Sequence, residues 1–339
     1  MDLFDFSQTT EAFVTIAVVA GMFALFVRET YPTEVVAIAA SQFMGGGDEQ
    51  SADQAAVAAM HDALGKLVID GTICIGEGTP DETDKLFSGE KIGPGDGPKM
   101  DIALVALEGK SVVARGGPNA MTVIAMAEDG GFLTVPNIYM DKIAVGPGLP
   151  EGIVDLDREP AENLGALSEA KGTPVSDLVV CMLDRPRHGE LIAKIRDAGA
   201  RIRLIQDGDV SGVIAATQVD AGIDIFLGIG GAPQGVLAAA ALRGVGGQMQ
   251  GRLIYRNNDD KVEAGKAGIE DFDRKYSAEE MASGNVTFAA TGVTYSDMLE
   301  GVRHVPGGAI THSMVLRSTT GTLRFIEGHH DFIRGTAKT

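Results

Sequence analysis

Strand-like and helix-like segments alternate three times in the second half of this chain, and this alternation constrains the fold more than any other feature. Each of three strand-like runs is followed by a stretch in which apolar residues recur at helical spacing. In chain order, these strands and helices fall at residues 178–183, 189–198, 201–205, 211–216, 223–229 and 234–242. Because parallel strands need crossover connections, this order predicts a parallel, doubly wound α/β sheet.

The first half of the chain contains an alanine-rich helix and further strands. Helical spacing of small and apolar residues from Ala55 to Leu67 predicts the helix. A hairpin or a strand is predicted at residues 68–75, with a turn at Asp70-Gly71, and strands are predicted at 101–107, 121–126 and 132–135. Near the C-terminus, residues 314–318 and 323–327 flank Gly321 as a hairpin, which we expect to extend the sheet of the second half.

A stretch with glycine and proline at residues 146–150 is the expected seam between the two halves. We therefore predict four parts along the chain. They are an atypical apolar N-terminal segment (1–34), a carboxylate-bearing half (35–150), a doubly wound half (151–330) and a tail (331–339).

The N-terminal segment carries no charged residue from Ala12 to Val27. This run is short for a membrane span, which needs about 20 apolar residues. No basic residue precedes it, which argues against a secretory signal. Three interpretations stay open: a helix packed on the domain, a membrane anchor or interfacial helix, and an extension unrelated to the domain.

The composition excludes some classes of partner. A formal net charge of −19 argues against nucleic acid, since binding to phosphate backbones requires a basic surface. It does not exclude a small anionic ligand, because local arginines or divalent cations can hold one. The two cysteines, Cys74 and Cys181, lie in apolar strand-like runs and indicate no disulfide framework, which fits a reducing cytoplasm.

The three strand-to-helix loops of the second half are rich in groups that bind phosphorylated sugars. They read Arg185-Pro186-Arg187-His188, Asp207-Gly208-Asp209 and Gly230-Gly231-Ala232-Pro233. Arginine presents a fork of donors to phosphate oxygens, and glycine-rich backbone before a helix offers free N–H groups to an anion. In a doubly wound sheet these loops share one edge, where ligands bind. Singly, each loop is equally explained as an exposed salt bridge, a helix cap or a tight turn.

The first half supplies carboxylates at the ends of separate elements. Asp53 lies at the start of the alanine-rich helix, Glu77 follows the first strand and Glu108 ends the next. Oxygen ligands of this kind suit hard cations such as Mg²⁺ or Mn²⁺. The alternative is a helix-terminal charge for Asp53 and a solvated turn for Glu77.

With these motifs assembled, the chain resembles the class II fructose-1,6-bisphosphatases, some of which also cleave sedoheptulose 1,7-bisphosphate. The resemblance covers roughly Val35 to Glu327. It is carried by the three loops above and by residues 52–57, 75–78, 89–91, 228–233 and 288–292. It implies the layered α/β/α/β/α sandwich of the lithium-sensitive sugar and inositol phosphatases.

The resemblance also implies roles for individual residues. The metal-ligand positions of the family fall on Asp53, Glu77, Val105, Glu108 and Gln234, with Mn²⁺ or Mg²⁺ as the ion. Its substrate contacts fall on Glu108, Gly109, Lys110, Tyr139, Arg185, Arg187, Asp207, Gly208, Asp209 and Gly231, and we add Pro186 and His188 from the same loop. Glu77 and Lys110 are the catalytic candidates.

Three of these positions depart from the family pattern. Val105 and Ala106 replace an Asp-Pro pair, Lys110 replaces a threonine that activates water, and Gln234 replaces a glutamate. Each of the changes at 105, 110 and 234 adds one positive charge. Asp101 cannot stand in for the missing aspartate, because four residues of strand put it about 13 Å from position 105.

The resemblance implies metal-dependent hydrolysis of fructose 1,6-bisphosphate, in gluconeogenesis or Calvin-type sugar metabolism, by a cytoplasmic homodimer or homotetramer. The three departures keep a second interpretation open, a sugar-phosphate-binding paralogue with impaired catalysis that acts as a sensor or partner subunit. In it, Lys110 substitutes for part of the charge of a metal ion.

Overall fold

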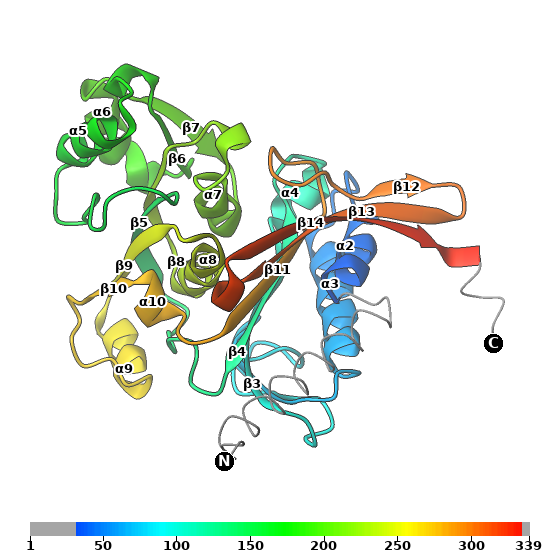
Figure 1. The fold of residues 1–339 in the computed structure, drawn as a ribbon. Coiled ribbons are helices and arrows are strands. Elements are labelled where there is room, and N and C mark those ends of the chain that lie inside the picture. The colour runs from blue at the N-terminus through cyan, green and yellow to red at the C-terminus, as the bar shows by residue number, and fades with distance from the viewer. Residues whose placement is uncertain (1–31, 334–339) are drawn as a thin grey trace, which may run out of the picture.

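Two β-sheets with helices between them and outside them form the molecule (Figure 1). The structure is a computed structural model that describes residues 32–333. The apolar run at 12–27 therefore lies outside the described residues. Among the helices from residue 32 to residue 333, none is long and apolar enough to cross a membrane.

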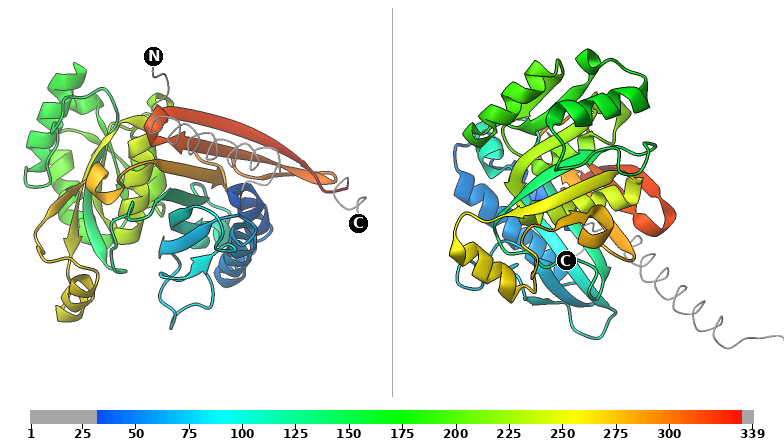
Figure 2. Two further views of the ribbon diagram at one scale, coloured as in Figure 1. Left: turned by 60° about the horizontal axis from the view of Figure 1, so that its bottom comes forward. Right: turned by 90° about the vertical axis from the view of Figure 1, so that its left-hand side faces the viewer.

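The first sheet combines strands from both ends of the chain. Its order is β12-β13-β11-β4-β3-β1-β2, and β14 pairs with β13. The strands are β1 (Asp70–Ile75), β2 (Lys91–Ile92), β3 (Lys99–Glu108), β4 (Met121–Glu128), β11 (Val286–Gly292), β12 (Arg303–Val305), β13 (Gly308–Arg317) and β14 (Thr322–Asp331). The β13–β14 hairpin extends past α2 at one end of this sheet (Figure 2).

The second sheet has the order β10-β9-β5-β8-β6-β7. Its strands are β5 (Tyr139–Val145), β6 (Val179–Leu183), β7 (Arg201–Ile205), β8 (Ile225–Gly231), β9 (Gln248–Ile254) and β10 (Lys275–Ser277). Strand β6 runs parallel to both β7 and β8, which confirms the predicted parallel core. The other strands are antiparallel additions, since β5 pairs antiparallel with β8 and β9.

Three hydrophobic cores separate the layers. Helices α2 (Pro32–Ser41) and α3 (Glu49–Leu64) pack on the outer face of the first sheet, and α5 (Pro160–Lys171) and α6 (Gly189–Asp197) pack on the outer face of the second. Between the sheets, α7 (Asp209–Ala215) and α8 (Ala232–Val245) share the largest core with both (Figure 1). The shorter helices are α4 (Lys110–Arg115), α9 (Asn258–Lys266) and α10 (Ala278–Met281). The layered α/β/α/β/α sandwich is confirmed.

Three local predictions were wrong. The C-terminal hairpin forms around Gly321 as expected, but it extends the first sheet, because β13 pairs with β11. Residues 132–135 form no strand, since only an isolated bridge joins Phe132 to Ala282. No turn occurs at Asp70-Gly71, where β1 begins and pairs with β3. Apolar alternation predicts strands without indicating which sheet they join.

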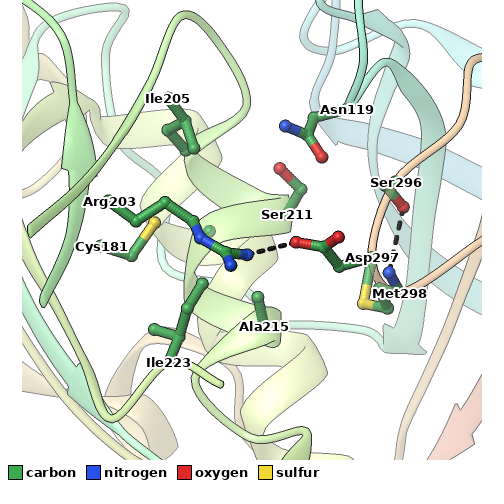
Figure 3. Close-up of a pocket in the computed structure, with 11 residues that line it drawn as sticks. Asn119, Cys181, Arg203, Ile205, Ser211, Ala215, Ile223, Ser296, Asp297 and Met298 are labelled. Carbon is green, nitrogen blue, oxygen red and sulfur yellow. Dashed lines mark hydrogen bonds and ion pairs between the residues drawn. The ribbon is translucent and has the colours of Figure 1, made fainter. Parts of the chain in front are cut away.

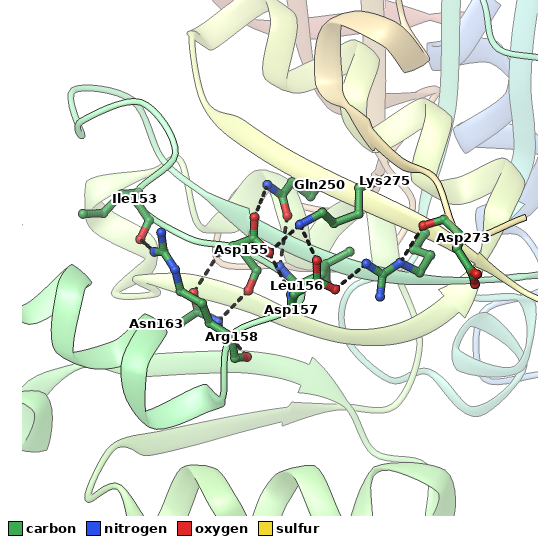
Figure 4. A network of polar contacts seen from close by, with 10 residues as sticks. Ile153, Asp155, Leu156, Asp157, Arg158, Asn163, Gln250, Asp273 and Lys275 are labelled. Carbon is green, nitrogen blue, oxygen red and sulfur yellow. Dashed lines mark hydrogen bonds and ion pairs between the residues drawn. The ribbon is translucent and has the colours of Figure 1, made fainter. Parts of the chain in front are cut away.

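A polar network anchors the connection that leads from β5 to α5 (Figure 4). Lys275 on β10 lies 2.6 Å from carboxylate oxygens of both Asp155 and Asp157. Gln250 on β9 accepts from the Leu156 N–H at 3.0 Å and donates to Asp155 at 3.2 Å. These contacts fix the irregular segment against the edge of the second sheet.

Candidate active site

The end of β3 and the helix α3 bring an aspartate, a glutamate and a lysine together. Gly109, with a φ of 88° that favours glycine, turns the chain from β3 into α4, which Lys110 begins. The Lys110 ammonium lies 3.4 Å from Oδ2 of Asp53 in the second turn of α3. Lys110 and Asp53 also influence the ionisation of Glu77, the nearby carboxylate that follows β1.

Glu77 is held by backbone at the start of a loop that folds back on itself. Its Oε1 accepts from the Ala106 N–H at 2.6 Å, and its own N–H donates to the Leu86 carbonyl at 2.8 Å. Gly76 is required here, because a Cβ at this position would lie 2.0 Å from the Leu86 oxygen. Burial raises the pKa of Glu77 to about 7, with the Ala106 N–H opposing this shift and Asp53 adding to it.

Glu108 joins the first sheet to the second half of the molecule. Its side chain is only 5% exposed. Its carboxylate accepts from the N–H groups of Val210 at 3.0 Å and Ser211 at 3.4 Å, in the first turn of α7. Burial raises its pKa to about 8, the Val210 N–H opposes this, and Asp209 and Asp207 add to it. Glu108 thus places the 207–209 loop beside the end of β3.

Arg185 and Asp207 come from neighbouring loops of the second sheet. Arg185 donates to the carbonyls of Asp184 at 3.0 Å and Gln206 at 2.5 Å, and its guanidinium lies 4.0 Å from the Asp207 carboxylate. Burial raises the pKa of Asp207, while Arg185 and Lys110 pull it down. Lys110, at the start of α4, therefore also acts on Asp207.

Arg187, the second arginine of its loop, is held by a single carbonyl. Its Nε and Nη2 donate to the Ile229 oxygen at 3.0 Å and 2.6 Å. Its guanidinium lies 4.9 Å from the centre of the Tyr139 ring, and that of Arg256 lies 5.4 Å from the same centre. Among residues 32–333, no carboxylate lies within ion-pair distance of Arg187. Its charge remains available to an anion.

His188 and Asp209 are occupied within the protein. The His188 ring is 1% exposed; Nδ1 lies 2.8 Å from the Leu183 oxygen, and Nε2 accepts from the Ile229 N–H at 2.9 Å. This geometry makes His188 a brace between β6 and β8. The Asp209 carboxylate pairs with the buried Lys142.

The remaining substrate candidates lie just before α6, α7 and α8. Pro186 begins the 3₁₀ turn that leads into α6 and leaves the two arginines on either side of it. Gly231 precedes α8 and faces Tyr139 across β5 and β8. A Cβ at Gly231 would lie 1.9 Å from Oε1 of Gln234, so the side chain of Gln234 folds over this glycine. Gly208 takes a φ of 97° as it turns the chain into α7.

A small cavity lies beside the site, between α7 and the loop after β11 (Figure 3). An ion pair between Arg203 and Asp297 crosses it, and Ser211, Cys181 and Asn119 line it. Its volume of about 30 Å³ leaves room for only a few water molecules. It therefore does not enlarge the site.

The sequence matches a known protein family over nearly its whole length. The model of the bacterial, glpX-encoded fructose-1,6-bisphosphatase matches residues 25–330. The chain belongs to this family. It is 43% identical over 331 residues to the D-fructose 1,6-bisphosphatase class 2/sedoheptulose 1,7-bisphosphatase of Trichodesmium erythraeum, covering 90% of this chain and 95% of that one. The protein of the same name from Synechococcus sp. (strain JA-3-3Ab) is 43% identical over 324 residues, covering 88% and 92%.

Class II fructose-1,6-bisphosphatases are metal-dependent phosphatases, so the site is expected to contain residues that fit a divalent cation. Among the described residues, no three or more His, Cys, Asp and Glu side chains are arranged to hold one. Asp53 faces an ammonium and Glu108 faces the backbone of α7. The side chain of Val105 packs against the hydrophobic core between the two sheets. The carboxylates therefore do not form a ready-made ion site.

Asp101 has another task, as the predicted distance from position 105 suggested. Its Oδ2 accepts from the N–H groups of Gly130 at 2.8 Å and Gly131 at 3.1 Å, in the turn after β4. It therefore stabilises that turn and takes no part in the site.

Two cationic residues of the site escaped prediction from sequence. Arg256 follows β9 by two residues, and Lys142 lies in the middle of β5. For Lys142 a signal existed, because a charged residue inside the strand-like run 139–145 needs a buried partner. Arg256 carried no comparable signal, since it reaches Tyr139 only through the pairing of β5 with β9.

Proposed function

We propose that this chain hydrolyses the 1-phosphate of fructose 1,6-bisphosphate, giving fructose 6-phosphate and phosphate. The observation that carries the proposal is the contact of Glu108 with the N-terminal turn of α7. It joins the carboxylate–lysine cluster at the end of β3 to the arginine-bearing loops of the second sheet. Hydrolysis of a phosphate ester needs both parts. Cationic groups bind the negatively charged phosphate, and polar groups act beside the bond that breaks.

In this proposal, the loops of the second sheet bind the sugar phosphate. Arg185 and Arg187 are pinned by backbone carbonyls, so their free N–H groups are already oriented for phosphate oxygens. Asp207 is half-buried and accepts from sugar hydroxyls. The ring of Tyr139 helps to hold the Arg187 guanidinium in place through a cation–π contact.

Glu77 and Lys110 act at the bond that breaks. The Glu77 carboxylate is the group placed to take a proton from an attacking water. The Lys110 ammonium balances negative charge on the phosphoryl oxygens, which is the largest electrostatic demand of phosphoryl transfer. Asp53 orients Lys110 through their ion pair.

Mn²⁺ or Mg²⁺ is the ion that we propose for this member of the family. Asp53, Glu77 and Glu108 are the candidate ligands, although in this structure Asp53 pairs with Lys110 and Glu108 accepts from the backbone of α7. Carboxylate oxygens are the donors that these hard cations prefer. Family membership supports the need for an ion, while Lys110 and the absence of donors at Val105 support weaker binding. Activity measured with each ion and after chelation tests this assignment.

Sedoheptulose 1,7-bisphosphate is a second substrate that we propose, because the two cyanobacterial relatives carry both activities in their names. The two sugars share the phosphoryl group that leaves and differ in the distance to the second phosphate. Initial rates with each bisphosphate at equal concentration measure the preference.

The decisive experiment is release of inorganic phosphate from fructose 1,6-bisphosphate with Mn²⁺ or Mg²⁺. The matched variant carries Val105→Asp, Lys110→Thr and Gln234→Glu, which restores the family residues. Turnover by the natural sequence confirms the proposal. Activity that appears only in the triple variant contradicts it and would make the natural chain a sugar-phosphate-binding paralogue, a sensor or partner subunit that calorimetry would detect as binding without turnover.

The cellular setting is part of the proposal. We infer a cytoplasmic enzyme of gluconeogenesis or of a Calvin-type cycle, acting as a homodimer or homotetramer. The division at 34, 150 and 330 is proposed only for segments along the chain, because β5 precedes residue 150 and joins the second sheet, while β11 to β14 return to the first. Light scattering of the purified chain and fractionation of cells with and without detergent test the assembly and the location.

A further inference from the structure

Lys142 is a lysine with no exposed surface, and its side chain is among the largest of the fully buried ones in the described part of the chain. It lies in the middle of β5, where it faces Gly228 on β8 and Gly251 on β9. Gly235 on α8 lies next to it as well, because a Cβ there would be in van der Waals contact with Cδ of Lys142, at 3.4 Å. The neighbouring positions on β8, β9 and α8 are therefore all glycines.

The ammonium of Lys142 ends between two loops of the site. It forms an ion pair with the carboxylate of Asp209, which begins α7. It also donates to the carbonyl oxygen of Gly231 at 3.0 Å, at the end of β8. One buried cation thus ties the loop after β7 to the loop after β8.

Asp209 is buried on its other side as well. Its side chain is 7% exposed, and a Cβ at Gly230 would lie 1.7 Å from its Oδ2. The carboxylate therefore lies directly on the backbone of Gly230. Asp207, two residues earlier, is less buried and lies near Arg185. The two aspartates of this loop have different surroundings.

We propose that Lys142 is a positioning residue that locks the 207–209 loop against Gly230 and Gly231, and that Asp209 anchors this lock while Asp207 alone contacts the sugar. The statement that Asp207 alone contacts the sugar rests on the proposed function. A buried ion pair contributes little net stability when compared with apolar replacements, but removing one partner leaves an uncompensated charge. The ion pair matters here because it fixes the relative positions of two loops that bind the same substrate.

The test uses Lys142→Met, Asp209→Asn and the double variant, each as the full chain. Amide hydrogen exchange reports the loops directly, in peptides that cover residues 206–212 and 229–233. We expect faster exchange in both peptides for each single variant. The control is Lys171→Met, which breaks the pair of Lys171 with Asp224 at the other end of the same sheet. It should leave both peptides unchanged.

Kinetics separate anchoring from sugar contact. We expect Lys142→Met to raise KM for fructose 1,6-bisphosphate about ten-fold with a smaller change in kcat, since loss of uniform binding appears in KM. Because both groups serve one lock, adding Asp209→Asn should then cause no further rise. A further rise in the double variant, as large as in Asp209→Asn alone, would overturn the proposal by showing direct contact with the sugar.

The test of the Lys142 proposal can fail or succeed independently of the proposed catalytic function. A natural chain that neither binds nor hydrolyses the bisphosphate refutes that function, and hydrogen exchange still decides on the lock. Unchanged exchange in Lys142→Met would overturn the lock even in an active enzyme. If Lys142→Met fails to fold, Asp209→Asn retains the size of the side chain and gives the same exchange measurement.

Discussion

The Nζ atom of Lys110 lies 3.4 Å from Oδ2 of Asp53. The same ammonium lowers the pKa values of Glu77 and Asp207, against the larger effect of burial. Lys110 is therefore a cation among three carboxylates that come from α3, from the loop after β1 and from the loop after β7. A divalent ion brought to Asp53 must compete with it.

Replacing Lys110 should tighten binding of Mn²⁺. Two unit charges about 4 Å apart interact by about 1 kcal/mol in water and more near a protein surface. We therefore expect Lys110→Thr to lower the dissociation constant for Mn²⁺ about five- to ten-fold, measured by calorimetry without substrate.

The matched control for this change is Lys266→Thr on α9. Lys266 forms an exposed ion pair with Glu263 at 2.7 Å, so the variant removes a similar charge far from the site. An affinity for Mn²⁺ that is the same in Lys110→Thr and in the natural chain would show that Lys110 does not compete with the ion.

Glu108 should make the ion-free protein less stable as the pH rises. Burial raises its folded pKa from 4.5 to about 8. Between these values the folded state keeps a proton that the unfolded state has lost, so stability is complete below about pH 4.5 and falls as the pH approaches 8. We expect Glu108→Gln, which keeps an acceptor for α7, to remove a loss on the order of 5 kcal/mol across this pH range.

Urea unfolding at several pH values in the presence of a chelator measures this effect. Glu128→Gln on β4 is the control, because Glu128 is exposed and accepts from Asn285 at 2.9 Å. Equal pH dependence in Glu108→Gln and in the natural chain would contradict the assignment.

The sequence predicted the parts of the site that follow strands directly. Arg185 and Asp207 come after β6 and β7, and parallel strands must bring such loops to one edge. Lys142 and Arg256 were not predictable in the same way. Their neighbours are set by the antiparallel pairing of β5 with β8 and β9, which no local pattern reveals. The misplaced C-terminal hairpin has the same cause, since its strands pair across the whole chain with β11.

Lys275 should matter for stability at neutral pH. Burial would raise the pKa of Asp155, but Lys275 and other donors hold it at about 2. A depressed carboxyl pKa stabilises the fold above the unfolded value near 3.9 and loses this effect as the pH falls toward 2. Because the pair is partly exposed, we expect Lys275→Met to cost about 1 kcal/mol at pH 7.

The measurement is urea unfolding of both chains at pH 7 and at pH 3. The difference between Lys275→Met and the natural chain should shrink at pH 3, since Asp155 then loses charge in a growing share of molecules. Lys194→Met is the control, because Lys194 pairs with the exposed Glu159 at 3.0 Å. A difference that is the same at both pH values would show that Lys275 acts through packing alone.

Arg256 should contribute to binding of the bisphosphate without taking part in hydrolysis. Its Nε and Nη2 are held by Asp260 at 3.1 Å and 3.2 Å, which leaves Nη1 to donate beside Tyr139. Together with Arg187 it puts two guanidinium groups on one ring. We expect Arg256→Met to raise KM for fructose 1,6-bisphosphate about ten-fold and to leave kcat nearly unchanged, because a contact made equally before and during reaction affects KM alone.

The chain offers a close control in Arg274. Its guanidinium lies 4.9 Å from the centre of the Tyr276 ring and 2.7 Å from Glu280, the same combination of aromatic and carboxylate contacts at the edge of the second sheet. Arg274→Met should therefore lose comparable stability and keep the natural KM. If both variants keep the natural KM, Arg256 serves only to pair with Asp260 at the start of α9. If kcat falls with KM unchanged in Arg256→Met, the residue acts on the reacting phosphate, and the prediction is contradicted.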